Sequence, residues 1–313
     1  MTNQSDNQFN KNYQDEIDLS ELLETLWSRK LTIGIITSLF IFFAILISLM
    51  MPNIYKSSAT MMPVEASSTM SGMLGQYSGM ASLAGISLPS ETGTKAQEAI
   101  ARIQSFEFFS NYFLPNISLE DILAVKKWDS NSNTLIYDER DFNASSGKWI
   151  REAKPPRQIV PSAQEAYEEY IKIMSISEDK KTLFVSLSIE HKSPFVAQRW
   201  VELIINQIDK VIRNEDKQEA TRSVDYLNSL ASTVNYEEIK KTLSSLQEEH
   251  MKRLMMVEAN ENYIFKVLDS PIVPEIKSKP RRSIIVLLGA ILGIIFSIFV
   301  TLAHNYLNKP HKD

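Results

Sequence analysis

Two uncharged hydrophobic segments lie near the ends of the sequence and enclose a long polar region. They cover residues 31–51 and 283–303, and each contains 21 residues without Asp, Glu, Lys or Arg. At about 1.5 Å of rise per residue, a helix of that length matches a hydrocarbon core roughly 30 Å thick. The 231 residues between them, 52–282, contain 28 Lys and Arg and 31 Asp and Glu. The pattern predicts two transmembrane helices that bracket one large domain in water.

Hydrophobic positions also recur in the tail that precedes the first segment. Residues 1–14 are rich in Asn, Gln and Ser and are typical of disorder. Leu22, Leu26 and Trp27 then follow helical spacing, with acidic residues such as Asp18 on the other face. Within the tail 1–30 we therefore expect an amphipathic membrane-entry helix with Trp27 at the interface. It is interpreted either as a simple anchor or as a docking surface for a partner.

The polar region contains strand patterns. Residues 173–177 and 183–189 alternate with period two around a polar turn, which predicts a β-hairpin. Leu183, Val185, Leu187 and Ile189 are expected on one face of it. Pairing with strands at 54–64 and 263–268 would give the sheet of an α+β lobe close to the membrane.

Helical patterns fill much of the remainder. Residues 95–113 predict one helix, Ser162 begins another, and Ser193 with Pro194 marks the start of a third. This third pattern predicts long protruding helices over 194–259, with a bend near 233–236. Residues 213–219 contain no apolar side chain, so the helix is expected to run through solvent there. The apolar stripe that resumes beyond them predicts a partner helix, assigned to another subunit.

Residues 66–90 are dominated by Ser, Gly, Met and Ala. Two interpretations stay open for them: a flexible loop, or a segment that orders only against a neighbouring subunit.

Charges that flank the hydrophobic segments bear on orientation. Arg29 and Lys30 favour a cytoplasmic N-terminal tail, and the first helix usually dominates topology. We expect residues 1–30 and the short tail 304–313 in the cytoplasm and residues 52–282 outside it. The first segment is expected to be a signal anchor, because its apolar core is too long for a cleaved signal peptide.

Composition excludes several classes of chemistry. The sequence contains no Cys, so disulfides, thiolate catalysis and Cys-ligated metals are excluded, and its four His lack metal-ligand spacing. Phosphate-loop, zinc-protease and nucleophile-elbow motifs are absent from it. The mild negative charge of the polar region argues against a nucleic-acid partner. We predict that the chain is not an enzyme and binds no cofactor or metal.

One polar stretch, residues 127–161, holds candidates for sugar contact. Trp128, Trp149 and Arg157 are of the types that stack on and hydrogen-bond sugars. Structural or surface roles for these side chains are the alternative. The stretch itself is expected to be irregular.

The approach to the second hydrophobic segment is rich in proline and positive charge. Pro271, Pro274 and Pro280 forbid helix and hold the chain extended. Arg281 and its basic neighbours are expected to contact lipid phosphates. Gly289 and Gly293 then form a Gly-x-x-x-Gly motif that allows another helix to approach closely.

Taken together, these end motifs resemble the bacterial polysaccharide chain-length determinants, or polysaccharide co-polymerases. The resemblance rests on residues 15–27, on Pro271 and Pro274 leading to Pro280 and Arg281, and on Gly289 and Gly293. Family members usually have Ser-Pro-Lys where this chain has Lys279-Pro280-Arg281, a departure that retains the ring and the charge. Because ten residues follow position 303, the chain resembles the kinase-free branch.

The resemblance implies a bacterial inner-membrane protein whose large domain is periplasmic. Its expected fold class is an α+β membrane protein with a membrane-proximal mixed lobe and a long protruding helix. Its expected function is to regulate the modal length of lipopolysaccharide O-antigen or a related surface polysaccharide. The implied partners are further copies of the chain in a ring, an integral-membrane polymerase, the bilayer and, as a further candidate, the growing polysaccharide. The alternatives are a two-helix membrane sensor with an extracytoplasmic ligand-binding domain and an export adaptor.

Overall fold

The computed structural model describes residues 26–64, 94–234 and 236–307. The chain divides into two compact units, one formed by residues 1–52 with 279–313 and the other by residues 53–278.

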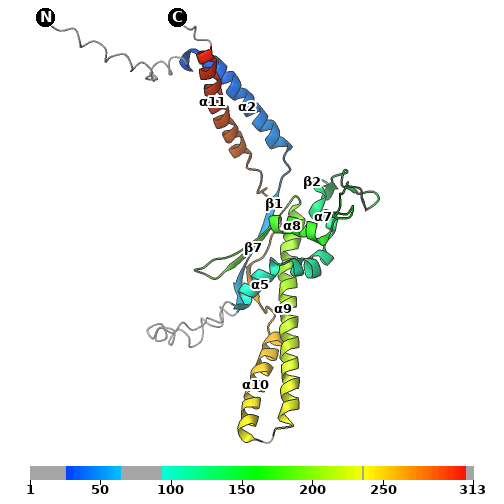
Figure 1. Ribbon diagram of the computed structural model, residues 1–313. Helices are drawn as coiled ribbons and strands as arrows, with labels where there is room; N and C mark the ends of the chain where they lie inside the picture. The colour runs from blue at the N-terminus through cyan, green and yellow to red at the C-terminus, as the bar shows by residue number, and fades with distance from the viewer. Residues whose placement is uncertain (1–25, 65–93, 235, 308–313) are drawn as a thin grey trace, which may run out of the picture. The chain divides into compact units, whose positions relative to one another are not determined.

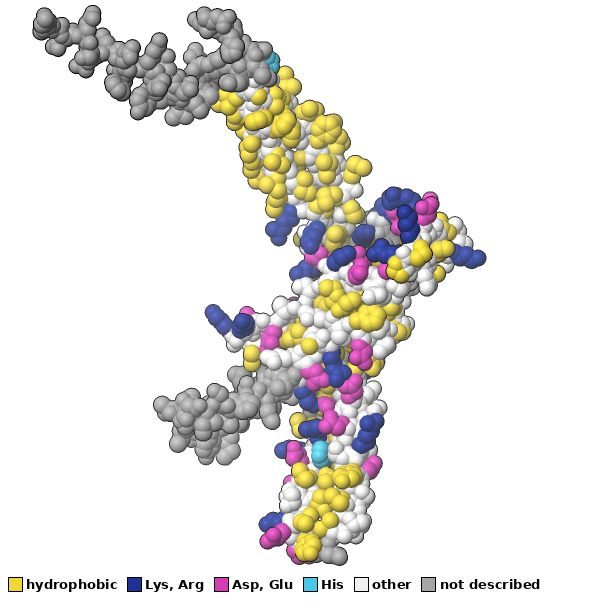
Figure 2. Space-filling model, in the orientation of Figure 1, with side chains coloured by type: hydrophobic (Ala, Val, Ile, Leu, Met, Phe, Trp, Pro, Cys, Tyr) yellow, Lys and Arg dark blue, Asp and Glu magenta, His cyan; other side chains and the backbone are white. Residues whose placement is uncertain are grey.

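The first unit contains a pair of apolar helices, α2 (Lys30–Met50) and α11 (Arg282–Leu307). Large apolar side chains point outward from both, among them Leu39 and Phe299. Figure 2 shows hydrophobic side chains over the visible face of the pair. Both helices are long and apolar enough to cross a membrane. The two predicted hydrophobic helices are therefore present.

The second unit is built on a four-stranded antiparallel sheet with strand order β6-β7-β1-β8. The strands are β1 (Tyr55–Pro63), β6 (Met174–Glu178), β7 (Val185–His191) and β8 (Phe265–Asp269). Alternate residues of β7 are fully buried, as period-two patterning requires. The predicted hairpin and its pairing with the strand after the first apolar helix are confirmed, whereas β8 joins the sheet through β1 and does not pair with the hairpin.

Leu183 is an exception to the predicted hairpin face. Its φ of 59° places it in the turn before β7, and its side chain is partly exposed. Residues 179–182 bend around the Asp179 side chain, whose Oδ1 accepts hydrogen bonds from the amides of Lys181 and Thr182. The strand pattern therefore begins later than the sequence predicted.

Helices cover one face of the sheet. The first half of α9 (Pro194–Ala231) buries an apolar row against the strands, and α8 (Ala163–Ile173) packs beside it. Ser193 caps α9 as predicted, since its Oγ accepts from the Val196 amide, and Ser162, predicted to begin a helix, forms a capping box with Glu165. An aromatic cluster fills the space between the helices; its rings belong to Phe109, Phe113, Tyr170 and Trp200.

The single helix predicted over 95–113 is wrong. The structure has α5 (Thr94–Ile103), α6 (Phe106–Phe108) and a π-helical turn (Phe109–Phe113). Ser105 adopts an extended conformation, and its side chain accepts a hydrogen bond from the Phe108 amide, which ends one helix and caps the next. Phe106, the first residue of α6, is exposed.

The stretch expected to be irregular contains two short antiparallel pairs, here called the hairpin module (residues 125–161). β2 (Val125–Asp129) pairs with β3 (Thr134–Tyr137), and β4 (Phe142–Asn143) pairs with β5 (Lys148–Trp149). Figure 1 shows the module next to the end of the sheet where β1 begins. The expectation of irregular chain was therefore wrong.

The bend expected near 233–236 is a complete reversal. α9 ends at Ala231, and α10 (Glu237–Ala259) returns along it (Figure 1). Gln247 bonds to Asn228 near the turn, and Glu258 pairs with Lys217 at the far end, so the helices are antiparallel. α10 packs along the distal half of α9, where Leu227 and Leu243 are buried, so a helix of the same chain covers part of the apolar stripe that was assigned to a partner from another subunit.

Candidate functional site

The two glycines of the Gly-x-x-x-Gly motif lie against α2. A Cβ added to Gly289 would come 2.5 Å from the Cβ of Ala44, and one added to Gly293 would come 2.8 Å from the Cβ of Phe40. Any larger side chain at these positions requires the helices to move apart. Gly34, by contrast, has no atom within 4 Å of an added Cβ. Gly289 and Gly293 thus permit close approach of α2 and α11.

Hydroxyl side chains accompany this contact. Ser297 and Thr301 of α11 are buried and donate to the carbonyls of Ile294 and Ser297 in their own helix. Among the described residues, no hydrogen-bond partner lies within reach of the hydroxyls of Thr37 and Ser48 in α2. Small or polar residues therefore form much of the surface between the two helices.

The α2 half of this contact was missed in the sequence. Thr37, Ala44 and Ser48 are spaced at i, i+7 and i+11, which places them on one helical face. That spacing of small residues inside an apolar helix was the available signal.

The proline segment is pinned to the start of β1. Ser57 Oγ donates a 2.7 Å hydrogen bond to the carbonyl of Ile272, and the Ser278 amide donates a 2.8 Å hydrogen bond to the carbonyl of Ile54. Pro271, which precedes Ile272, is buried. The segment that leaves the sheet toward α11 therefore runs beside the segment that enters β1.

The other family-motif residues lie outside the buried part of that segment. Pro274 is half-buried in the second unit. Pro280 and Arg281 belong to the first unit, where the Arg281 carbonyl accepts from the amides of Ile284 and Ile285 in the first turn of α11.

A polar cluster joins the base of the α9–α10 hairpin to the sheet. Asp209 Oδ1 accepts from the amides of Tyr263 and Ile264 at 2.9 and 3.0 Å. The Asp209 carboxylate also binds Arg213, whose guanidinium donates to carbonyls at the end of α10, at Val257, Asn260 and Glu261. We call this arrangement the hairpin clasp (Asp209, Arg213 and the carbonyls of 257–261).

Beside the clasp, Lys95 of α5 bonds to Asp216 and to the hydroxyl of Tyr263. Burial works to lower the pKa of Lys95, but the hydrogen bonds to Asp216 and Tyr263 outweigh it and raise that pKa. Burial, and then the hydrogen bond to Asp216, raises the pKa of Tyr263. The polar stretch 213–219, expected in solvent, is therefore held by partly buried polar contacts at its start.

The three candidates for sugar contact have different local partners. Trp128 packs edge-on against Tyr55 at 5.6 Å between ring centroids and donates a 2.9 Å hydrogen bond to Asn133. Trp149 packs on Phe142 at 5.2 Å. In the part of the chain described, no ring contact joins the two indoles.

Arg157 differs from the tryptophans. Its side chain is 63% exposed and lies 3.8 Å from the Glu165 carboxylate. Glu165 is already held by Arg151 at 2.6 Å, and this pairing lowers the Glu165 pKa. Of the three candidates, Arg157 presents the most accessible polar group.

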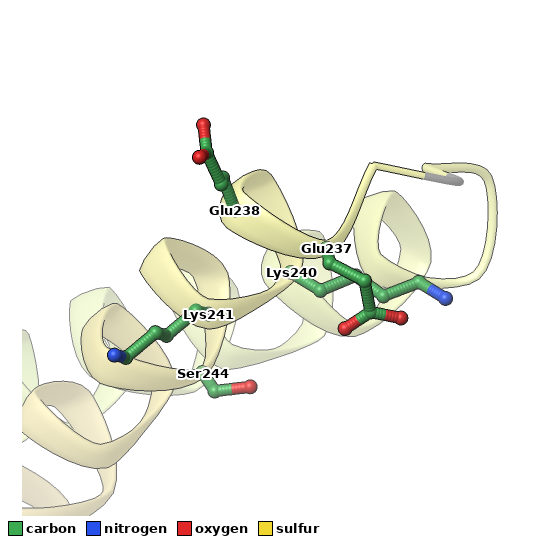
Figure 3. Close-up of a pocket in the computed structure, with 5 residues that line it drawn as sticks. All are labelled: Glu237, Glu238, Lys240, Lys241 and Ser244. Atoms are coloured by element: carbon green, nitrogen blue, oxygen red, sulfur yellow. The ribbon is translucent and has the colours of Figure 1, made fainter.

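A shallow depression lies at the first turns of α10. It is lined by Glu237, Glu238, Lys240, Lys241 and Ser244. Figure 3 shows Glu238 and Lys241 pointing away from one another and outward from the helix. The lining residues are all exposed, so the depression does not bring charged groups into a sheltered arrangement.

No group of three or more His, Asp or Glu side chains suited to a metal ion occurs within residues 26–64, 94–234 and 236–307.

The membrane-entry candidates are only partly described. Asp18 and Leu22 lie outside the described residues, as does the stretch 66–90. Leu26 and Trp27 lie in a helical turn before α2, and the Trp27 side chain is exposed with Lys30 Nζ 5.3 Å from its ring.

The sequence and the structure were compared with known protein families and solved structures. Residues 15–113 match the model of the family described as Wzz, chain length determinant protein. No curated protein sequence matches the chain. Among solved structures, the chain is similar to a full-length bacterial polysaccharide co-polymerase, with a TM-score of 0.42, 14% identity and coverage of 95% of this chain and 100% of that one.

It is also similar to a fragment of WzzB, a polysaccharide co-polymerase from Salmonella Typhimurium, with a TM-score of 0.31, 14% identity and coverage of 72% of this chain and 100% of that one. Both TM-scores lie below 0.5, so neither likeness establishes a shared fold. The family match is confined to residues 15–113, a segment that includes α2 and β1.

Proposed function

We propose that this protein regulates the modal chain length of a surface polysaccharide, such as lipopolysaccharide O-antigen, without catalysing bond formation. The observation that carries the proposal is the match of residues 15–113 to the chain length determinant family. In this proposal the protein is a homo-oligomeric scaffold that acts on a separate integral-membrane polymerase. α2 and α11 anchor it in the inner membrane, with the tails cytoplasmic and residues 53–278 periplasmic.

The connection between the sheet and α11 is proposed to transmit this regulation. Pro271 and Pro274 lie in a segment that is bonded to the start of β1, so the two chain segments that leave the sheet toward the membrane move together. Pro280 and Arg281 lead that connection into α11, and Gly289 and Gly293 lock α11 against α2. A change in the sheet would therefore reach both apolar helices at once.

Deletion of the gene tests the function. The surface polysaccharide of the deletion strain is separated by size on a gel and compared with that of strains complemented with the wild type, Gly293→Leu or Gly34→Leu. The deletion is expected to broaden or shift the length distribution, and the wild type and Gly34→Leu are expected to restore it. Gly293→Leu should restore it poorly. A distribution that does not change on deletion refutes the proposal.

The antiparallel α9–α10 hairpin favours one further candidate, an export adaptor that reaches away from the membrane through a helical hairpin. The pair of apolar helices counts against it, because such adaptors usually have one membrane helix. The same deletion separates the two functions. Loss of an adaptor abolishes export, whereas loss of a length regulator leaves polysaccharide at the surface with altered length.

A further inference from the structure

One loop of the hairpin module exposes aliphatic side chains together on the surface. Ile150, Ile159 and Val160 are 51%, 56% and 57% exposed. Arg151 joins the two arms of this loop, because its guanidinium donates to the carbonyls of Gln158 and Ile159 at 2.6 and 2.9 Å. Ile150 and Ile159 therefore lie on neighbouring backbone, and their exposure is maintained by a fixed structure.

Basic side chains are the more numerous charged residues in this stretch, and one acidic residue from outside it, Asp141, lies beside Ile150, whose amide donates to the Asp141 carbonyl. Lys148, Lys154 and Arg157 are exposed, whereas the charge of Arg151 is taken up by Glu165. Glu152 is the one acidic residue between positions 148 and 160. Lys154 and Arg157 flank a turn that presents Pro155 and Pro156 to solvent. We call residues 148–160 the basic–apolar loop, and Figure 2 shows hydrophobic and basic side chains side by side on the visible face of the module.

A mixture of exposed aliphatic and basic side chains suits the interfacial region of an anionic bilayer. The aliphatic groups favour the boundary of the acyl chains, and the cations favour lipid phosphates. A soluble anionic ligand would use the charges but would leave the three aliphatic side chains in water. The chemistry of the loop therefore favours a lipid surface.

The module is fixed to the end of the sheet from which both chain segments leave toward the apolar helices. Trp128 packs on Tyr55, the first residue of β1, and Lys192 donates to the carbonyl of Val125. Tyr55 follows the last residue of α2 by five positions. At a maximum of about 3.4 Å per residue, five residues span no more than roughly 17 Å. A bilayer that holds α2 is therefore within a short covalent distance of this end of the sheet.

We propose that the basic–apolar loop docks on the surface of the same bilayer that anchors α2 and α11. Ile150, Ile159 and Val160 enter the interfacial region, while Lys148, Lys154 and Arg157 bind anionic lipid phosphates. This contact would limit how far the module swings away from the membrane. The inference rests on the membrane anchoring proposed above and adds a second, peripheral attachment.

The absence of cysteine in the native sequence makes a direct test simple. The full chain carries a single cysteine, labelled with an environment-sensitive fluorophore, at Val160→Cys, at Ile239→Cys or at Phe299→Cys. Ile239 is an exposed residue of α10, and Phe299 is an exposed residue of α11. Each protein is reconstituted in vesicles of phosphatidylcholine and phosphatidylglycerol at about 3:1, which include a lipid-borne quencher.

Quenching at position 160 is expected to exceed that at position 239 by at least about threefold, because only the former meets lipid. Quenching at position 299 reports insertion of α11 on its own. If position 299 is quenched and position 160 behaves like position 239, the docking proposal is wrong and the anchoring stands. If position 299 is not quenched, the proposed membrane anchoring of α11 is wrong, and the docking proposal that depends on it is wrong as well.

The charge requirement is tested with a triple substitution, Lys148→Glu, Lys154→Glu and Arg157→Glu. It should reduce quenching at position 160 to the level of position 239, as should vesicles of phosphatidylcholine alone. The matched control is the double substitution Lys240→Glu and Lys241→Glu on α10. It should leave the quenching at position 160 unchanged. Equal quenching with and without anionic lipid overturns the phosphate contact. Protection of position 160 from aqueous iodide without quenching by lipid identifies a protein surface as the occupant and overturns the proposal.

Discussion

The imidazole of His191 accepts a 3.0 Å hydrogen bond at Nδ1 from the amide of Ser193, the residue that caps α9. Its other nitrogen, Nε2, lies 2.9 Å from the carbonyl of Asp121. Both bonds are satisfied when the ring is neutral with its proton on Nε2. A proton added to Nδ1 would face the Ser193 N–H and remove the first bond.

This arrangement predicts that the domain loses stability in mild acid. Burial lowers the pKa of His191 below its ordinary value near 6.5, despite the hydrogen bonds to Asp121 and Ser193. In the unfolded chain the residue takes up a proton near pH 6.5, while the folded chain does not, so the free energy of unfolding falls as pH drops below that value. One titrating group limits this slope to at most about 1.4 kcal/mol per pH unit. Chemical unfolding of the full chain between pH 8 and 5 measures it.

His191→Asn is the matched control, because the Asn carbonyl oxygen can accept from the Ser193 amide and does not titrate. The variant should lose less stability than the wild type between pH 7 and 5. Parallel curves for the two proteins would show that His191 is not the group responsible.

The contact between the apolar helices predicts a steric effect at Gly293. Leucine there would overlap Phe40 and Thr37, so α2 and α11 should separate by a few ångströms. Spin labels on Trp27→Cys and His304→Cys, near the ends of the two antiparallel helices, report the change as a longer label-to-label distance. Gly34→Leu adds the same side chain where space is open and should leave the distance as in the wild type. Equal distances in all three proteins contradict this assignment.

The hairpin clasp predicts that Arg213 matters more than its exposure suggests. Arg213→Ala removes hydrogen bonds to three carbonyls and leaves the partly buried Asp209 without its cation. A loss of about 2–3 kcal/mol in the free energy of unfolding is expected. Amides near residues 257–264 should exchange faster with deuterium, since α10 loses its terminal contacts. Arg222→Ala, on an exposed turn of the same helix, should change neither measurement.

The sheet could be predicted from the sequence, whereas the helical hairpin could not. A half-buried antiparallel strand alternates with period two, and Val185, Leu187 and Ile189 display that period without ambiguity. The reversal after Ala231 lacks the Gly or Pro that usually marks a turn. It depends on contacts between α9 and α10, such as the burial of Leu227 and Leu243, which no local pattern encodes.

For the site residues too, the sequence indicated local features but not the contacts between distant segments. Gly289 and Gly293 were recognised as a surface for close helix approach, but the sequence did not identify α2 as the helix they meet. The hairpin module was missed because its strands have two to five residues and are held by ring contacts, from Tyr137 to Phe142 and from Phe142 to Trp149. Periodicity cannot detect strands that short.

The sugar-contact candidates lead to a prediction that separates folding from binding. Trp128 packs between Tyr55 and Phe195, so Trp128→Ala should destabilise the domain by about 2 kcal/mol. Arg157 is exposed and its nearest carboxylate is already paired, so Arg157→Ala should change stability by less than about 0.5 kcal/mol. Urea unfolding of both variants checks these values. Titration of the folded Arg157→Ala protein with purified surface polysaccharide then tests binding alone: weaker binding than that of the wild type supports a sugar contact at Arg157, and identical binding removes it.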